Sequence, residues 1–500
     1  MPLTPTAIYK DLKNNELDRT SAIELLISLI ENAENIKTRT ESIEILEKIN
    51  VKDKKVFKVL ENLFISDSNE KVRCLSSQVL KTLFLNDAIP VLKWGLQHER
   101  SLNCLISIIA NLGDINNNKA KAVLMKKFQE INKKKYKYNI KPIVEEKSVE
   151  ALSNHELAEI LINYYVISSL KLKFGYVKFE NSRNGTIISL DLSNVEYQGL
   201  GLNKLTNSLE SILSLSFLKK LDLSNNQIKN LPEFIKQSKN LEFLDLSFNN
   251  LSRLPKSISS IFNLKILNLK SNNIRYIPES IGSLTNLEQL ILRDNYLDKL
   301  PGSICSLSKL KILDLHHNRL RKLPDNFNYL SSLKELELGW NKFGNIPYTL
   351  EKFNSLEKLN FGRNHLIQLP DWIGSLQLLK ELHLYDNGIK NFPPSFSDLT
   401  NLESLNLRNN QITEFPICFK FLFNLKKLNL SWNNLSFLPN WIDNLSSLEE
   451  LNLWGNKLKE IPDSIESLLN LKILYLNFNK VEEFSKTLQS LKDRGVAIKI

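Results

Sequence analysis

The residues best suited to metal or catalytic chemistry are two His-Glu dipeptides, His98-Glu99 and His155-Glu156. The second could open the zinc pattern His-Glu-x-x-His, in which two imidazoles one helical turn apart hold the metal. Glu159 occupies the place of the second histidine, so this pattern fails. Ser153 stands three residues before Glu156, which is the spacing of a capping box, and the glutamate is therefore explained as part of a helix start.

Other reactive residue types are scattered along the chain. The cysteines lack metal-ligand spacing and lie in apolar surroundings, which predicts buried free thiols in a reducing, cytoplasmic setting: Cys74, Cys104, Cys305 and Cys418. The chain has no Gly-x-x-x-x-Gly-Lys-Ser/Thr loop, and Gly199-Leu-Gly201 has no strand-to-helix context for a dinucleotide. The sequence therefore predicts a non-enzymatic protein without a cofactor or a metal.

The elements that would position a site are set by a repeat. Twelve repeats of 23 residues follow one another without insertion from Leu218 to Asn479, with the pattern Leu-x-x-Leu-x-Leu-x-x-Asn, in which Phe361 takes the place of the third leucine once. Eleven of them carry a proline six residues after the asparagine. We number the positions of each repeat from its leading leucine: Leu218, Leu241, Leu264, Leu287, Leu310, Leu333, Leu356, Leu379, Leu402, Leu425, Leu448 and Leu471.

The repeat pattern predicts a solenoid. Leucines at positions 4 and 6 point to the same side of a short strand, and the stacked strands predict one parallel sheet. The asparagine at position 9, such as Asn341, is expected to satisfy backbone groups where the chain leaves the strand. Proline donates no hydrogen bond and suits the return arm. One repeat buries too little apolar surface to be stable alone, so the stack must fold together.

This repeat resembles the short intracellular leucine-rich repeats of Ras-pathway and Scribble-type scaffold proteins. The resemblance implies an α/β leucine-rich repeat horseshoe with a parallel sheet on its concave face. It further implies a cytoplasmic signalling scaffold or adaptor that binds a protein partner on that face, often a small GTPase or a phosphatase complex. Extracellular leucine-rich repeat proteins usually carry cysteine-rich caps, and this chain has none.

Positions 3, 5, 7 and 8 of each repeat would face the concave side. Position 5 is acidic in early repeats, at Asp222, Asp245, Asp314 and Glu337, and neutral in later ones. From the sixth repeat on, positions 7 and 8 carry large aromatic residues and arginines, which dominate binding hot spots. We therefore predict these partner-binding residues: Trp340, Arg363, Tyr385, Arg408, Trp432, Trp454 and Phe478. In the alternative interpretation, some of them stack on neighbouring repeats and only shield the sheet.

A shared metal site on the same face is not expected. His316 and His317 lie three repeats from His383, about 14 Å away at ~4.8 Å per strand.

Before the repeats the apolar spacing is helical. We expect helices over residues 21–34, 38–49, 53–65, 69–84, 88–97, 101–112 and 119–131, with capping boxes at Ser21-Glu24, Thr38-Glu41 and Asp67-Glu70. The run from Asp67 to Arg73 resembles a HEAT or armadillo-like repeat, so residues 1–131 are interpreted as a HEAT-like α-solenoid. HEAT-repeat di-iron hydroxylases of the deoxyhypusine hydroxylase type use four His-Glu pairs. The two pairs here leave that enzyme as an alternative.

The remaining segments are expected to cap the repeats. Residues 132–186 read as a linker, a helix from near Ser153 and a hairpin around Asn184-Gly185. The repeats then span residues 187–480, including a degenerate first one in which Val195 replaces the asparagine. Residues 481–500 form the C-terminal cap, with a helix over 482–493 stopped near Gly495 and a strand over 496–500.

The formal net charge of +11 is unevenly placed. Residues 119–141 hold nine lysines and one acid, Glu130, which we interpret as the solvated face of a helix and its tail. The alternative is a lysine-mediated peripheral contact with an anionic membrane. No apolar run is long enough to span a membrane, and no nucleic-acid motif accompanies the lysines.

Overall fold

The computed structural model describes residues 3–133, 149–182, 186–195, 205–481 and 486–500. It divides into two compact parts. The helical part comprises residues 1–191 and 204–219, and the repeat part comprises residues 192–203 and 220–500. Each part is described below by itself.

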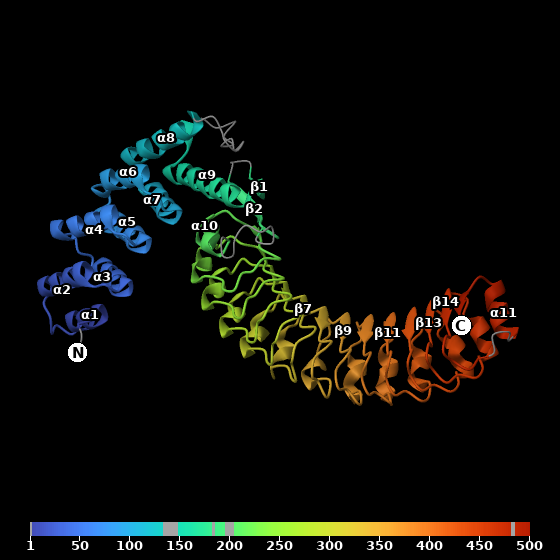
Figure 1. Ribbon diagram of the computed structural model, residues 1–500. Helices are drawn as coiled ribbons and strands as arrows, with labels where there is room; N and C mark the ends of the chain where they lie inside the picture. The colour runs from blue at the N-terminus through green and yellow to red at the C-terminus, as the bar shows by residue number, and fades with distance from the viewer. Residues whose placement is uncertain (1–2, 134–148, 183–185, 196–204, 482–485) are drawn as a thin grey trace. The chain divides into compact units, whose positions relative to one another are not determined.

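The helical part consists of helices packed in pairs and one short hairpin (Figure 1). Its helices are α1 (Pro5–Lys13), α2 (Arg19–Asn32), α3 (Ile36–Lys48), α4 (Lys54–Ser66), α5 (Glu70–Phe84), α6 (Ala88–His98), α7 (Leu102–Asp114), α8 (Asn118–Lys133), α9 (Asn154–Phe174) and α10 (Leu209–Leu213). The strands β1 (Lys178–Asn181) and β2 (Ile187–Asp191) pair antiparallel. The expected all-helical region before the repeats is thus present. The expected turn at Asn184-Gly185 and most of the linker, residues 134–148, lie outside the described residues.

Two expected helix starts are wrong by two residues. The α2 N-cap is Asp18, whose carboxylate accepts from the backbone N–H groups of Thr20 and Ser21. The α3 N-cap is Asn35, which accepts from the N–H of Lys37. In both helices a short side chain immediately before the first turn, Asp18 or Asn35, caps the helix in place of the predicted capping box three residues later. The capping box of Ser153 and Glu156 is confirmed at the start of α9.

Glu159 of α9 is a buried acid whose Oε2 atom has no hydrogen-bond partner in the described part of the chain. Burial raises its pKa, and contacts with Ser216 and His155 only partly oppose this. Because the folded-state pKa lies above the unfolded one, this carboxyl costs nothing in strong acid and destabilises progressively as the pH rises through its folded pKa. We therefore expect Glu159→Gln to raise the thermal unfolding midpoint at pH 8 and to leave it unchanged at pH 4. Equal midpoints at pH 8 would contradict this, and exposed Glu150→Gln serves as the control.

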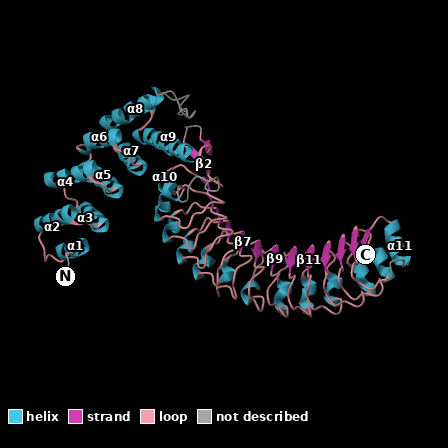
Figure 2. Cartoon of the chain, viewed as in Figure 1, coloured by secondary structure: helices cyan, strands magenta, loops and turns pink. Residues whose placement is uncertain are grey.

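The repeat part is a stack of three-residue strands joined by 3-10 helices. The strands are β3 (Lys220–Asp222), β4 (Phe243–Asp245), β5 (Ile266–Asn268), β6 (Gln289–Ile291), β7 (Ile312–Asp314), β8 (Glu335–Glu337), β9 (Lys358–Asn360), β10 (Glu381–His383), β11 (Ser404–Asn406), β12 (Lys427–Asn429), β13 (Glu450–Asn452), β14 (Ile473–Tyr475) and β15 (Ala497–Lys499). Each pairs in parallel with the next, so the sheet order is the chain order. Figure 2 shows these strands along the inner edge of an arc and the 3-10 helices along its outer edge.

The outer 3-10 helices begin after the repeated prolines, which cap most of them with extended backbone. They are η3 (Glu233–Gln237), η4 (Lys256–Ser260), η5 (Glu279–Ser283), η6 (Gly302–Ser306), η7 (Phe327–Tyr329), η8 (Tyr348–Leu350), η9 (Asp371–Ser375), η10 (Pro394–Asp398), η11 (Ile417–Phe421), η12 (Asn440–Asn444) and η13 (Asp463–Ser467). Between the two layers the leucines of positions 1, 4 and 6 are almost fully buried. The core is therefore continuous from repeat to repeat, as expected.

The asparagine at position 9 connects successive repeats. Asn341 Nδ2 donates to the carbonyl of Leu315 in the preceding repeat at 2.9 Å, and to the carbonyls of Leu338 and Gly339 in its own at 3.0 and 3.2 Å. Its Oδ1 accepts from the backbone N–H of Leu320 at 2.9 Å. The same pattern recurs along the array, which confirms the structural role expected of this position.

A second connection between repeats is electrostatic. Position 2 alternates between glutamate and lysine, and neighbours form exposed ion pairs with Nζ to Oε distances of 2.7 to 2.8 Å. The pairs are Glu242 with Lys265, Glu288 with Lys311, Glu357 with both Lys334 and Lys380, Glu403 with Lys426, and Glu449 with Lys472. Lys311 and Lys334 are neighbours of the same sign and interrupt the alternation. Exposed pairs of this kind contribute at most about 1 kcal/mol each, so they tune the stacking and do not drive it.

Both ends of the repeat part resemble the expected caps. Leu192 and Asn194 donate backbone hydrogen bonds to Asp222 and Ser224, which places the degenerate first repeat against β3. At the other end α11 (Lys486–Asp493) is followed by Gly495, whose positive φ allows the turn into β15. The expected helix start at residues 482–485 lies outside the described residues.

Candidate functional site

The concave face carries one residue per repeat in a strained backbone conformation. Position 8 has φ between +53° and +56° in most repeats, a left-handed region that favours glycine and asparagine. Only Gly455 supplies glycine there, whereas Trp340, Arg363, Trp432 and Phe478 are large side chains. A non-glycine residue in this region costs of order 1 kcal/mol or more, so the fold does not select these large residues. These large side chains nevertheless lie on an exposed face of the repeats.

Trp340 and Arg363 form a stack across two repeats. The Arg363 guanidinium carbon lies 3.8 Å from the centroid of the Trp340 ring, and its Nε donates to Asp386 at 2.6 Å. Asp386 also accepts from Asn409 at 2.9 Å. The stack therefore presents a rigid, preorganised aromatic and cationic surface.

Three further predicted residues form a row on the last repeats, and we call them the aromatic row: Trp432, Trp454 and Phe478. The ring centroids of Trp432 and Trp454 are 6.2 Å apart, and those of Trp454 and Phe478 are 6.0 Å apart with nearly parallel planes. The three side chains remain 47, 38 and 75% exposed. These rings therefore stack on neighbouring repeats, as in the alternative interpretation, and each still leaves more than a third of its surface exposed.

The other two predicted residues differ from each other. Arg408 is exposed, and within the described residues its side chain has no hydrogen-bond or ion-pair partner. Tyr385 is half-buried because its ring lies over Gly362, where an added Cβ would be only 2.3 Å from the ring. Tyr385 therefore fills space that glycine leaves on the neighbouring repeat, and it is less available to a partner.

At position 5 the aspartates and asparagines also bond to the backbone. The Asp314 carboxylate accepts from the backbone N–H of His316, two residues on, at 3.0 Å. Asp222, Asp245, Asn360 and Asn452 make the same bond. Aspartate and asparagine share this turn geometry, so the column is selected first for the bend after each strand.

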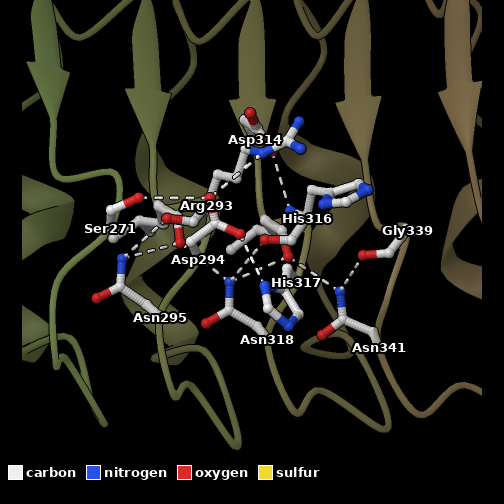
Figure 3. Close-up of polar contacts among 12 residues, drawn as sticks. Ser271, Arg293, Asp294, Asn295, Asp314, His316, His317, Asn318, Gly339 and Asn341 are labelled. Atoms are coloured by element: carbon white, nitrogen blue, oxygen red, sulfur yellow. Dashed lines mark hydrogen bonds and ion pairs between the residues drawn. The ribbon is translucent and has the colours of Figure 1, made fainter. Parts of the chain in front are cut away.

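A polar cluster that the sequence did not single out lies on the same face (Figure 3). His317 Nδ1 lies 2.7 Å from Asp294, and the Arg293 Nε lies 3.5 Å from the same carboxylate. Burial alone would raise the pKa of Asp294, but His317 and Arg293 hold it below its usual value. Burial raises the pKa of Asp314 to about 6, and the neighbouring Glu337 adds to the effect.

His316 belongs to this cluster as a neutral, buried side chain. It is 7% exposed, and burial lowers its pKa to about 4. Its Nδ1 has no hydrogen-bond partner in the described residues. The sequence feature that accompanies this burial is the glycine at position 7 of the next repeat. A Cβ at Gly339 would lie 2.8 Å from the His316 ring, so only glycine leaves room for the ring there.

The His-Glu pairs are committed to other contacts. Glu99 binds the Arg73 guanidinium at 2.9 and 3.0 Å, which together with backbone bonds holds its pKa at about 2 against the effect of burial. Glu156 caps α9. In the described residues no three histidine, cysteine or acidic side chains come close enough to hold a metal ion. These contacts count against the di-iron alternative. No described helix is long and apolar enough to cross a membrane.

Family models match most of the repeat part. The model "Leucine-rich repeat region" matches residues 189–292 and 256–361, "Leucine Rich repeats (2 copies)" matches 377–418 and 446–492, and "Leucine Rich Repeat" matches 424–445. Together these matches cover more than half of the chain. A comparison with curated protein sequences finds no match.

Two solved structures are similar to part of this chain. A leucine-rich repeat protein of Leptospira interrogans is 32% identical over 62% of this chain and 95% of its own, with a TM-score of 0.46. PEPR1, in a structure with AtPEP1, is 26% identical over 64% of this chain, with a TM-score of 0.52. The match spans about half, 48%, of PEPR1. The chain is a member of the leucine-rich repeat family.

Proposed function

We propose that the protein is a non-enzymatic scaffold or adaptor that binds a protein partner on the concave face of its leucine-rich repeats. The observation that carries this proposal is the aromatic row with the Trp340–Arg363 stack. Large rings and a guanidinium group stay exposed there, and Trp340, Arg363, Trp432 and Phe478 do so in a backbone conformation that disfavours them. Such residues bury much area and lose little rotamer freedom on binding, which is why they dominate interface energetics.

The finer parts of the proposal rest on the resemblance of the repeat to Ras-pathway and Scribble-type proteins. A small GTPase is the partner class that this resemblance favours, in a signalling role in the cytoplasm. The four cysteines are free thiols, three of them buried, and this supports a reducing compartment. A direct binding assay with purified GTPases in both nucleotide states tests the partner class.

Replacing Arg408, Trp432 and Trp454 together by alanine should abolish partner capture while the fold persists. The three side chains lie on the surface, so their loss removes contact area without opening the core. Capture is measured by affinity purification and quantitative mass spectrometry, and circular dichroism reports the fold. Capture equal to that of the wild type would exclude this face.

The matched control is Phe437→Ala. Phe437 lies in the same repeat as Trp432 and is 49% exposed, close to the 47% of Trp432, but it sits at position 13, outside the concave columns. It should leave capture unchanged. Loss of capture in this variant would show that exposed apolar area in general, and not the concave face, recruits the partner.

A further inference from the structure

Carboxylates outnumber bases at the centre of the concave sheet. Positions 3 and 5 of β7 to β10 carry four acids, which we call the acidic strip: Asp314, Glu335, Glu337 and Glu381. The one lysine at these positions is Lys358, whose Nζ lies 3.0 Å from Glu337 and 3.9 Å from Glu381. Asp314 and Glu337 face each other in register on adjacent strands. Like charges directly opposite destabilise a sheet, so this arrangement calls for a compensating cation.

No cation of the described residues compensates Asp314 fully. Arg293 is the base drawn nearest to it in Figure 3, but the ion pair of Arg293 is with Asp294, and its Nε has no hydrogen-bond partner in the described residues. Asp314 accepts a hydrogen bond from a backbone N–H and, within the described residues, lies within 4.0 Å of no lysine or arginine nitrogen. Burial raises the pKa of Asp314 to about 6, and the opposing effects of the His316 N–H and the Arg293 charge only partly offset it.

A second observation at the same place concerns His316. Its imidazole is more than nine-tenths buried beside Asp314 on the same side of the sheet (Figure 3), and its Nδ1 is unpartnered in the described residues. Being neutral, it cannot serve as the counter-ion. Buried polar atoms in folded proteins are nearly always hydrogen-bonded, so an unpartnered nitrogen beside an uncompensated carboxylate marks a site that another molecule completes.

We propose that the acidic strip binds a basic side chain of the protein partner, a lysine or an arginine, between Asp314 and Glu337. The cationic group would neutralise the facing carboxylates and donate to the free nitrogen of His316. This proposal rests on the proposed function, since it names the chemistry by which the concave face selects its partner. It implies that the partner contributes a basic residue near β7 and β8 and an apolar surface over the aromatic row.

The test uses the full chain and a defined probe, the acetylated, amidated peptide Lys-Gly-Lys-Gly-Lys, with the matching glutamate peptide as its counterpart. The chain has a formal net charge of +11, so bulk electrostatics oppose binding of the lysine peptide, and any binding must be local. We expect isothermal titration calorimetry at low ionic strength to show binding of the lysine peptide and no binding of the glutamate peptide.

Asp314→Asn with Glu337→Gln should weaken this binding at least tenfold. The asparagine keeps an oxygen for the backbone N–H of His316, as Asn360 does for its own turn. The control, Glu403→Gln with Glu450→Gln, changes the net charge equally, just before β11 and on β13, and should alter affinity less than twofold. Equal effects of the two double variants, or binding of the glutamate peptide, would overturn the proposal.

Stability and pH separate a binding role from a merely structural one. If the role of Asp314 is to bind the partner, Asp314→Asn removes its repulsion with Glu337 and should raise the thermal unfolding midpoint at pH 7.5. A lower midpoint would show that the Asp314 carboxylate stabilises the fold. Wild-type affinity should fall between pH 7.5 and pH 5 as Asp314 is protonated. His317 is the other imidazole of this cluster and pairs with Asp294, so His317→Asn is the control and should preserve most of the fall.

The two hypotheses fail separately. If the lysine peptide binds the double variant normally while alanine at Trp432 and Trp454 still abolishes capture, the acidic strip is excluded and the concave face stands. If capture survives the loss of the aromatic residues, the proposed face itself is excluded.

Discussion

Asn341→Ala should lower the free energy of local opening of its repeat by about 1 to 3 kcal/mol. The substitution removes four hydrogen bonds at once and leaves the buried N–H of Leu320 without a partner, whereas the carbonyl of Leu315 keeps its bond from Asn318. A buried polar group left unpaired costs about 1 to 3 kcal/mol. Because these bonds join neighbouring repeats, the array should lose cooperativity at this point.

Hydrogen exchange followed by mass spectrometry measures this effect directly. Peptides that cover residues 315–341 should exchange faster, while those near the C-terminal cap should not. Asn354→Ala is the control, because Asn354 is exposed and its side chain makes no hydrogen bond in the described residues, so a change under about 0.5 kcal/mol is expected. If the Asn341 variant exchanges at the wild-type rate, the side-chain amide of Asn341 does not stabilise the contact between neighbouring repeats.

Gly374→Ala should destabilise the outer layer by about 3 kcal/mol or more. An added Cβ would lie 2.1 Å from the carbonyl oxygen of Ser395 and 3.0 Å from its carbon, in the next repeat. Both atoms belong to the backbone, so no rotamer change relieves the clash and η9 must move away from η10. Overpacking costs about 1 to 3 kcal/mol even where side chains can yield, and here they cannot.

Gly302→Ala is the matched control for this prediction. Gly302 begins η6 in the same layer, but an added Cβ there meets no atom within 4 Å. Alanine should be neutral or stabilise by about 0.4 to 1 kcal/mol through the unfolded chain. Urea unfolding compares the two variants, and equal midpoints would show that the outer layer adjusts freely.

Much of the fold follows from the period of the sequence. Leucines at positions 1, 4 and 6 fix the buried side of each strand, and the asparagine and proline columns fix the two bends. The backbone conformation at position 8 was harder to foresee, because residues as different as Asp294, Trp340 and Phe478 share it. The turn after each strand imposes this positive φ, whatever the intrinsic conformational preference of the residue at position 8.

The candidate site was only partly accessible from sequence. The repeat positions of the exposed rings could be read from the sequence. How far each ring is exposed depends on the residue 23 positions away: the Tyr385 ring lies over Gly362, while Arg363 stacks on Trp340. The role of Asp314 in its turn, and its missing counter-ion, depend on distances that spacing alone does not give. Burial of His316 likewise needed the three-dimensional arrangement around Gly339.

The alternating glutamates and lysines at position 2 bear on how such an array can change in length. Duplication or deletion of one repeat sets two like charges side by side, the situation already present at Lys311 and Lys334. Gain or loss of two repeats at a time preserves the alternation. The penalty for an odd step is small and screened by salt, yet it acts on each such event. The column thus favours growth of the array in pairs, and the Lys311–Lys334 junction is the one place in the twelve repeats where the alternation is broken.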